Sequence, residues 1–459
     1  MSMNNELWQK VLNFDFDGPG DYTFSIRLAK ENHWTRNFTQ QALLEYRKFM
    51  YLAATSGSMV SPSEIVDIVW HQHLIFTQSY TEFCTLLGRQ IQHIPSTHNK
   101  QEAETFKQAK EHTTRQYNSV FGAQPKAIWE YNDMFEPLNL PQAKHDIRAT
   151  VTIGLVLFLL LLVPTYYCLM PLYIHISGPA FVTGFALIIL AAYTWISNYN
   201  RNKLLQIITE ADESAFVFNL QPYELVYLKT QSPDYVVHGS VNELIVRNAI
   251  TINEDKSVTL NEDAVPEGRE QAQVVDVLNE FKWIPYPGLL KLLVNKPVFS
   301  SIANAMDAFR NYFTNSEKFA KLFRLNFIIG LLLLLTGYTR FFTGVSRNKP
   351  VMYIFLLNIA LTIGVILHLK RFKKEAFKTT IPNLYTTKSI PQTEVNDNWQ
   401  WRYLAEGTAV LYPVFIPIAQ QKPEAGTWGD GGSGGCGSSG GDGGGGSCGG
   451  GCGGCGGGD

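Results

Sequence analysis

Cysteine is scarce through most of this 459-residue sequence, because only Cys84 and Cys168 precede the final stretch, which holds the other four. This distribution excludes a disulfide framework spread through a fold. The N-terminus also lacks a basic segment followed by an apolar one, so we expect no cleavable signal peptide. The first domain is therefore expected to stay in the compartment where it is made.

Common enzyme signatures are absent as well. The sequence has no Walker loop, no Gly-x-Ser-x-Gly elbow and no His-Glu-x-x-His pair. The formal net charge is −2, which gives no overall basic excess for binding nucleic acid. What the sequence does have is length and apolar character: 45% of its residues are hydrophobic, which is enough to fill several modest cores.

Charged side chains are missing altogether between Arg148 and Arg201. Two apolar runs, at 149–170 and 178–197, occupy this stretch, and each is close to the ~20 residues that a helix needs to cross a bilayer. Proline and glycine, which break helices, lie between them. The sequence therefore predicts a first transmembrane hairpin over 149–197.

A second pair of apolar runs, at about 322–342 and 350–369, predicts another transmembrane hairpin over 322–369. The first of these runs is short, because its uncharged part lies between Arg324 and Arg340. We expect both arginine side chains to extend toward the lipid headgroups. The alternative is a buried helical hairpin in a soluble domain, but two such pairs in one chain favour the membrane.

Lysine and arginine gather on one side of the predicted spans. That side holds Lys144, Arg148, Arg201, Lys203, Lys318, Lys321, Arg324, Lys370, Arg371, Lys373 and Lys374. The other side holds only Arg340, Arg347 and Lys349. Because basic residues stay on the cytoplasmic side, we expect both termini and the middle domain to be cytoplasmic. In a bacterium this orientation places the chain in the inner membrane, with the lipid bilayer as a partner. Thiols in a cytoplasmic tail are expected to stay reduced.

Residues 1–140 are predicted to form a soluble all-α domain, because apolar residues recur at helical spacing. One helix has a clear start: Ser61 is expected as the N-cap, Pro62 as the first helical residue and Glu64 as the third, which is a capping box. We expect this helix to continue as far as Cys84.

The same helix and its surroundings carry a recognisable set of residues. The set comprises Asp67-x-x-Trp70-His71-x-His73-Leu74, Ser79-Tyr80, Phe83-Cys84, Leu87-Gly88-Arg89, His93-x-Pro95, Arg27-Leu28-Ala29-x-Glu31-Asn32-x-Trp34, Glu45-Tyr46-Arg47-x-Phe49, Tyr117, Phe121-Gly122 and Ile128-Trp129. Over most of residues 25–130 the chain thus resembles the helical domain shared by plant glycine-rich domain proteins and bacterial multi-pass membrane proteins with glycine-rich tails. The resemblance implies no activity, because that family has no established one.

The histidines of this helix are the first candidates for chemistry. His71 and His73 lie two residues apart, about 200° around the helix axis, so they cannot both bind one metal ion. Asp67 and His71 lie four residues apart and share a face. A carboxylate beside an imidazole is either half of a metal site or a simple orienting hydrogen bond.

Either His93 or His98 completes a site for a transition metal such as zinc if the chain turns back after Gly88. The alternative is structural: His73 is a core histidine, and the aspartate and the other helical histidine tie the helix to its neighbours. One possible ligand is missing in any case, because relatives often have paired histidines where this chain has Gln92 and His93.

Residues 210–318 predict a small cytoplasmic α+β domain between the two hairpins. The expected elements are helices at 220–228, 241–250, 267–282, 288–295 and 298–313, and strands at 250–252 and 258–260. Helix, helix and two-stranded wing is the order of a winged-helix unit. This half of the chain, with its late spans and tail, also resembles a bacterial membrane-protein family that has such a helix and wing segment.

The charge of this middle domain argues against DNA. Between Glu210 and Lys318 there are sixteen acidic and nine basic residues, whereas a phosphate-binding face needs a basic excess. We therefore expect no nucleic-acid partner. The simpler interpretation of this middle domain is a module that contacts protein partners or a second copy of the chain.

The chain ends in a polar segment at 370–428 and a tail at 429–459. Within the polar segment, two prolines interrupt the apolar stretch at 407–417, so we expect an extended segment on the protein or at the membrane interface and no fifth span. The tail is mostly glycine and is expected to be disordered, because such a composition cannot bury a core.

The tail cysteines are a second candidate for chemistry. Cys448, Cys452 and Cys455, with Cys436 further back, are soft ligands at spacings that zinc or copper(I) tolerates. Glycine on every side raises the entropic cost of closing the ligand loops. The alternative is a low-complexity tail without a stable site.

Three functions are open to a chain of this kind. We favour a membrane-anchored interaction or scaffold protein over a metal-dependent enzyme or metal-binding protein that uses Asp67, His71 and His93. A transporter ranks last, because the central parts of the predicted spans contain no Asp, Glu, Lys or Arg to line a path for ions or solutes.

Overall fold

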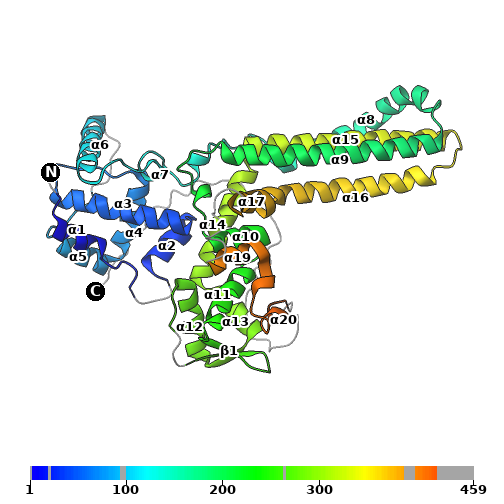
Figure 1. Cartoon of the computed structure of the whole chain (residues 1–459). Coiled ribbons are helices and arrows are strands. Elements are labelled where there is room, and N and C mark those ends of the chain that lie inside the picture. The colour runs from blue at the N-terminus through cyan, green and yellow to red at the C-terminus, as the bar shows by residue number, and fades with distance from the viewer. Residues whose placement is uncertain (1–2, 19–21, 94–99, 262–264, 387–397, 421–459) are drawn as a thin grey trace, which may run out of the picture. The chain divides into compact units, whose positions relative to one another are not determined.

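The computed structural model is mainly helical (Figure 1). The described residues are 3–18, 22–93, 100–261, 265–386 and 398–420. The glycine-rich tail predicted at 429–459, with Cys448, Cys452 and Cys455, lies outside them, and so does His98.

The N-terminal part is helical, as predicted. Its helices are α1 (Asn5–Leu12), α2 (Phe24–Asn32), α3 (Arg36–Thr55), α4 (Glu64–Ile75), α5 (Thr77–Leu86), α6 (Lys100–Phe121), α7 (Lys126–Trp129) and the 3-10 turn Glu136–Leu138. The long helix α3 lies at the centre and packs against α1, α2, α4, α6 and α7. The apolar stripe of α3 supplies Tyr46, Phe49 and Met50, all fully buried.

Two predictions about α4 are wrong. The helix begins at Glu64, and Ser63 is its N-cap, since the Ser63 hydroxyl accepts a hydrogen bond from the backbone N–H of Val66 at 3.2 Å. The sequence offers two serines, and the structure uses the second. The helix also ends at Ile75 instead of running on to Cys84, because Phe76 leaves the helical conformation and α5 starts after it.

The four predicted spans are confirmed as helices that are long and apolar enough to cross a membrane. They are α8 (Ile147–Tyr173), α9 (Gly178–Thr209), α15 (Glu317–Ser346) and α16 (Met352–Glu375), the last of which continues through a wider turn at Ala376–Thr380 into α17 (Ile381–Leu384). Helix α15 packs against α8, α9 and α16. Half of its apolar window is buried inside the protein, whereas no residue in the apolar window of α8 is fully buried.

One of the two flanking arginines behaves differently from our expectation. The guanidinium of Arg340 does not simply extend toward headgroups but donates hydrogen bonds to the carbonyl oxygens of Tyr173 and Ile176. These carbonyls lie at the C-terminal end of α8 and in the turn after it, where unpaired carbonyls favour a cation. Arg324 instead pairs with Glu317 at 3.4 Å, two turns closer to the helix start.

The middle part is an α+β arrangement with a small sheet. It contains the 3-10 turn Phe216–Phe218, α10 (Pro222–Thr230), α11 (Asp234–Val246), β1 (Ile250–Ile252), β2 (Ser257–Leu260), α12 (Arg269–Phe281), β3 (Trp283–Pro285), α13 (Tyr286–Val294) and α14 (Pro297–Thr314). The strands form an antiparallel sheet in the order β1-β2-β3. The predicted hairpin is confirmed, but β3 was not predicted, and α11 begins seven residues earlier than expected, after Pro233.

The segment at 407–417 lies on the protein, but it is not extended as expected. It belongs to a run of short helices, α19 (Trp399–Glu406), the 3-10 turn Gly407–Val410 and α20 (Ile416–Ala419). Phe415 is fully buried against Tyr286, at 4.9 Å between ring centroids. Burial of the apolar side chains fixes this segment where its prolines prevent one long helix.

The N-terminal and middle parts pack together through charged side chains. Arg36 pairs with Glu270 at 3.0 Å, and the Arg36 backbone N–H donates to Glu224 at 2.8 Å. Arg269 pairs with Asp17 at 2.5 Å. One hydrophobic core also continues from the N-terminal helices into the middle part.

Candidate metal centre

Two of the candidate ligands come from one face of α4. The i,i+4 spacing places Asp67 and His71 one turn apart, and the Asp67 carboxylate lies 3.5 Å from the Nε2 atom of His71. The opposite face of α4 carries Val66, Val69 and His73, which are fully buried. Burial of that face therefore directs the aspartate and His71 outward.

The third ligand, His93, arrives from the segment that follows α5. Gly88 has a φ of +71°, which a glycine adopts without strain, and the chain turns back there as the sequence analysis required. The hydroxyl of Tyr80 then donates to the carbonyl of Ile91, and Trp70 Nε1 donates to the same hydroxyl at 3.1 Å. The His93 ring packs edge-on against Trp70 with 4.6 Å between centroids.

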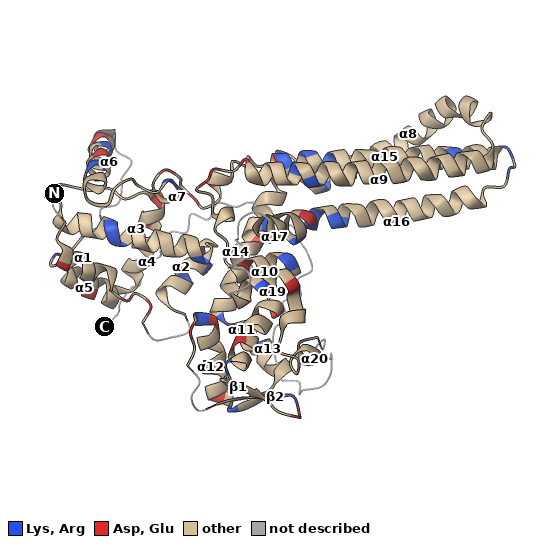
Figure 2. Ribbon diagram, viewed as in Figure 1, with Lys and Arg blue, Asp and Glu red and all other residues tan. Residues whose placement is uncertain are grey.

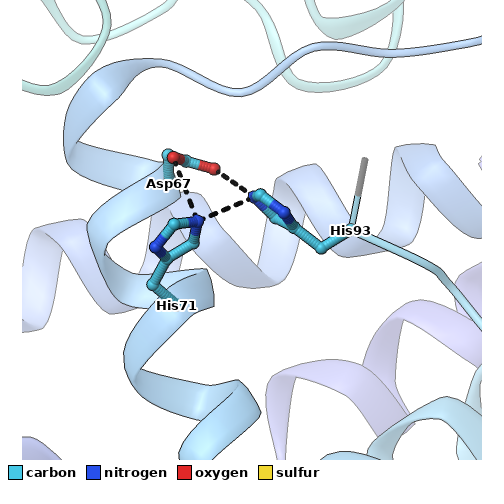
Figure 3. Close-up of side chains that lie close together, drawn as sticks. All are labelled: Asp67, His71 and His93. Atoms are coloured by element: carbon cyan, nitrogen blue, oxygen red, sulfur yellow. Dashed lines mark hydrogen bonds and ion pairs between the residues drawn. The ribbon is translucent and has the colours of Figure 1, made fainter. Parts of the chain in front are cut away.

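The three side chains point at one another, as Figure 3 shows. The Nε2 atoms of His71 and His93 are 2.9 Å apart, and His93 Nε2 lies 2.9 Å from a carboxylate oxygen of Asp67. One ligand atom from each residue lies within 4.8 Å of the others. Zinc binds histidine nitrogen at about 2.0–2.1 Å, so two neighbouring ligand atoms on one ion lie about 2.9 to 3.4 Å apart. The two separations of 2.9 Å lie at the lower end of this range, and the 3.5 Å between the other carboxylate oxygen of Asp67 and His71 Nε2 lies just above it.

Hydrogen bonding alone does not satisfy this arrangement. His93 Nε2 faces both the carboxylate of Asp67 and the Nε2 atom of His71. A single proton on His93 serves only one of these two contacts, and a proton on His71 leaves the lone pair of His93 facing the carboxylate. A cation between the three groups would accept a lone pair from each of them.

Among the residues that the structure describes, none covers one side of the site. A cleft of about 700 Å³ adjoins it and is lined by Asp67, Trp70, Arg89 and His93, together with the segment 56–64. The side chain of His71 is 59% exposed, whereas that of His93 is 16% exposed. Three protein ligands beside an open cleft leave coordination positions for water or a ligand, which is the pattern of catalytic rather than structural zinc sites.

His73 is a core histidine, as the structural alternative expected for this residue. Its Nδ1 lies 2.9 Å from the hydroxyl of Tyr46, and its Nε2 lies 3.1 Å from the hydroxyl of Ser79. Burial disfavours the charged imidazolium and lowers the pKa of His73 to about 4. This histidine is therefore neutral at physiological pH and takes no part in the outward-facing cluster.

Burial of the carboxylate of Glu45, nearby in α3, was not predicted from the sequence. Glu45 is 2% exposed and accepts hydrogen bonds from Tyr117 and Trp129, each at 2.7 Å, and from Lys48 at 2.8 Å. Three of these residues belong to the set that carries the family resemblance, but only the fold shows that they meet. Their shared role is to join α3, α6 and α7.

The fold and the site define a helical protein with four candidate membrane spans and a histidine and aspartate cluster in its N-terminal part. A family model described as UCP032817-like matches residues 21–121. The match includes all three residues of the cluster and overlaps most of the region, 25–130, for which the sequence predicted a family resemblance. No curated protein and no solved structure matches the chain.

Proposed function

We propose that this chain is a membrane-anchored metal-binding protein in which Asp67, His71 and His93 hold a divalent transition metal such as zinc. The observation that supports the proposal is the convergence of two imidazole nitrogens and a carboxylate oxygen within 4.8 Å. Such a ligand set suits zinc and related metals. The adjoining cleft gives a second molecule access to the ion, which is what metal-assisted hydrolysis requires.

The test is the metal content of the full chain, purified in detergent without a chelator or a histidine tag. We expect about one equivalent of metal per chain and a loss of at least tenfold in metal affinity in His71→Ala, because one of three ligands is removed. The matched control is His145→Ala, which alters an exposed histidine outside the cluster. Equal metal content in the wild type and His71→Ala would refute the proposed site.

The tail cysteines need their own control, because they are a second candidate for binding zinc or copper(I). The measurement is therefore repeated in a background in which Cys436, Cys448, Cys452 and Cys455 are serine. We expect the equivalent held by the histidine cluster to remain in this background. Metal that disappears with the cysteines would instead assign the site to the tail.

The setting that we propose is the cytoplasmic face of a membrane. The excess of lysine and arginine at one end of the spans supports an orientation with both termini and the middle domain in the cytoplasm, and in a bacterium this membrane is the inner one (Figure 2). We also propose the bacterial membrane proteins with glycine-rich tails as relatives.

An interaction or scaffold function is the second candidate, and an exposed aromatic pair favours it. Trp283 in β3 is 60% exposed and Phe281, just before it, is 45% exposed. Thr251 and Thr259 share the outer face of the sheet with Trp283, while Val258 on the other face is fully buried. Exposed tryptophan is typical of surfaces that bind protein, so we propose protein partners or self-association through a winged-helix-like module, without nucleic acid.

A further inference from the structure

A groove of about 340 Å³ lies between α9, α15 and α16. Its walls are almost entirely apolar. Gly330 and Gly364 contribute no side chain, which leaves space in the groove beside them. The polar residues that line it are Tyr193, Asn326 and His368, one from each helix. The groove thus combines apolar walls with hydrogen-bonding groups.

The polar residues are held in place by a network that joins the three helices. The amides of Asn200 and Asn326 exchange two hydrogen bonds, at 2.7 and 2.9 Å. The Asn326 oxygen also accepts from Nε2 of His368 at 2.7 Å. Because Nε2 of His368 is the donor, Nδ1 of the neutral ring is an acceptor, and no described residue donates to it. The His368 ring packs edge-on against Tyr193, with 5.4 Å between centroids.

Positive charge surrounds this polar network. Arg371 follows His368 by three residues and therefore lies on the same face of α16. Arg371 and Arg201 of α9 both act electrostatically on the carboxylate of Glu375, at the end of α16. The basic residues at this end of the two helices are Arg201, Lys203, Lys370, Arg371, Lys373 and Lys374 (Figure 2). Glu375 and Glu210, the carboxylates on which Arg201, Arg371 and Lys203 act, cannot neutralise all six of them.

We infer that the groove binds one anionic phospholipid of the surrounding bilayer. An acyl chain lies along the apolar walls, the headgroup phosphate lies beside Arg201 and Arg371, and a headgroup hydroxyl donates to Nδ1 of His368. Charge complementarity selects the occupant, because a zwitterionic lipid gains less from the basic residues than an anionic one. This inference does not depend on the metal centre.

For the test, the full chain is first delipidated in detergent. It is then exposed to mixed micelles that contain equal parts of phosphatidylglycerol and phosphatidylethanolamine, and native mass spectrometry measures the lipid that each chain binds. We expect one phosphatidylglycerol per chain and at least a tenfold preference over phosphatidylethanolamine. In Gly364→Leu we expect at least a tenfold loss of bound lipid, because a side chain at Gly364 meets no protein atom within 4 Å and enters the groove. Arg371→Gln should retain lipid but lose most of the preference.

Two control variants match these changes. Gly184→Leu also adds a side chain where no protein atom lies within 4 Å, but Gly184 does not line the groove. Lys349→Gln removes a positive charge near the opposite ends of the spans. Both should bind lipid as the wild type does. Equal retention of the two lipids by the wild-type chain, full binding by Gly364→Leu, or a dimer that leaves no bound lipid would each overturn the inference.

Discussion

Glu45 illustrates how a single charged residue stabilises this protein from inside. Its carboxylate has three donors from three places in the chain, and water does not reach it. A buried charge is tolerated only when such partners compensate for its lost hydration. The tyrosine and tryptophan of the network serve this carboxylate as donors while their rings fill the core.

We predict that Glu45→Gln lowers the free energy of unfolding by about 2 kcal/mol, because charge-assisted hydrogen bonds are lost and Lys48 is left without its partner. The shape of the side chain is nearly unchanged, so a change in packing does not explain the loss. Denaturant unfolding of the protein in detergent measures the effect. Glu82→Gln, at an exposed carboxylate, is the control and should change stability by less than about 0.5 kcal/mol. Equal effects in the two variants would contradict the account.

Three buried groups make stability depend on pH. Burial lowers the pKa of His73 and of His238 to about 4 and raises the pKa of Glu224 to about 7. Below pH 6.5 both histidines bind protons in the unfolded chain but stay neutral in the folded chain. Stability therefore falls as the pH drops from 6.5 toward about 4. Glu224 acts in the opposite sense, since its folded form keeps a proton that the unfolded chain releases as pH rises from 4.5 to about 7.

We therefore predict a maximum of the melting temperature near pH 6.5, because two histidines outweigh one glutamate below that pH. His73→Gln should reduce the fall of melting temperature between pH 6.5 and pH 4.5, whatever its effect at neutral pH. His145→Gln, an exposed position, should leave the pH profile unchanged. A profile that is identical in the wild type and His73→Gln would exclude the buried imidazole as a cause.

At the scale of elements, the four long helices are the features that local sequence predicts best. A run of about 20 apolar residues is sufficient to identify a span, and all four runs became helices. The ends were predicted less well, because flanking polar residues continue the helices: α9 extends to Thr209 and α15 starts at Glu317. Neither extension has an apolar pattern that a search for spans detects.

Reporter fusions test how these helices cross the membrane. We predict that a reporter fused after residue 203 or 378 reads as cytoplasmic and that one near residue 175 or 345 reads as external, because the basic residues flank the cytoplasmic ends. Alkaline phosphatase and a fluorescent protein give opposite signals and control for expression. A cytoplasmic reading at 345 would remove the second hairpin, and inverted readings throughout would reverse the orientation.

At the scale of the whole molecule, the N-terminal and middle parts form one unit rather than two independent domains. Arg36 and Arg269 connect the N-terminal helices to the middle part through Glu270 and Asp17. The proposed metal centre lies beside α4, and the exposed aromatic pair lies at the end of α12 and in β3, so the two proposed functions use different surfaces of one unit. They are therefore separable by mutation.

We predict that Trp283→Ser weakens self-association of the full chain by about 30-fold, the effect expected when an interfacial tryptophan worth about 2 kcal/mol is removed. Sedimentation in detergent at several concentrations measures the effect. Tyr412→Ser, at another exposed aromatic residue of the same unit, is the matched control. A wild-type chain that stays monomeric throughout would refute self-association, and unchanged metal content in Trp283→Ser would show that the two surfaces are independent.

The sequence by itself determined what depends on neighbours along the chain. It predicted the four apolar helices, the hairpin of β1 and β2, and the shared face of Asp67 and His71, because these follow from the spacing of residues within a few turns. It also offered the alternative that His73 is a core histidine, and the structure buries this residue completely.

The tertiary structure decided what depends on residues far apart. It chose His93 as the partner of Asp67 across 26 positions, placed Arg340 on the end of α8, and closed a groove between α9, α15 and α16. Such contacts arise from burial and from the pairing of polar groups that burial forces together. No local pattern encodes them, because the residues meet only when the whole chain has folded.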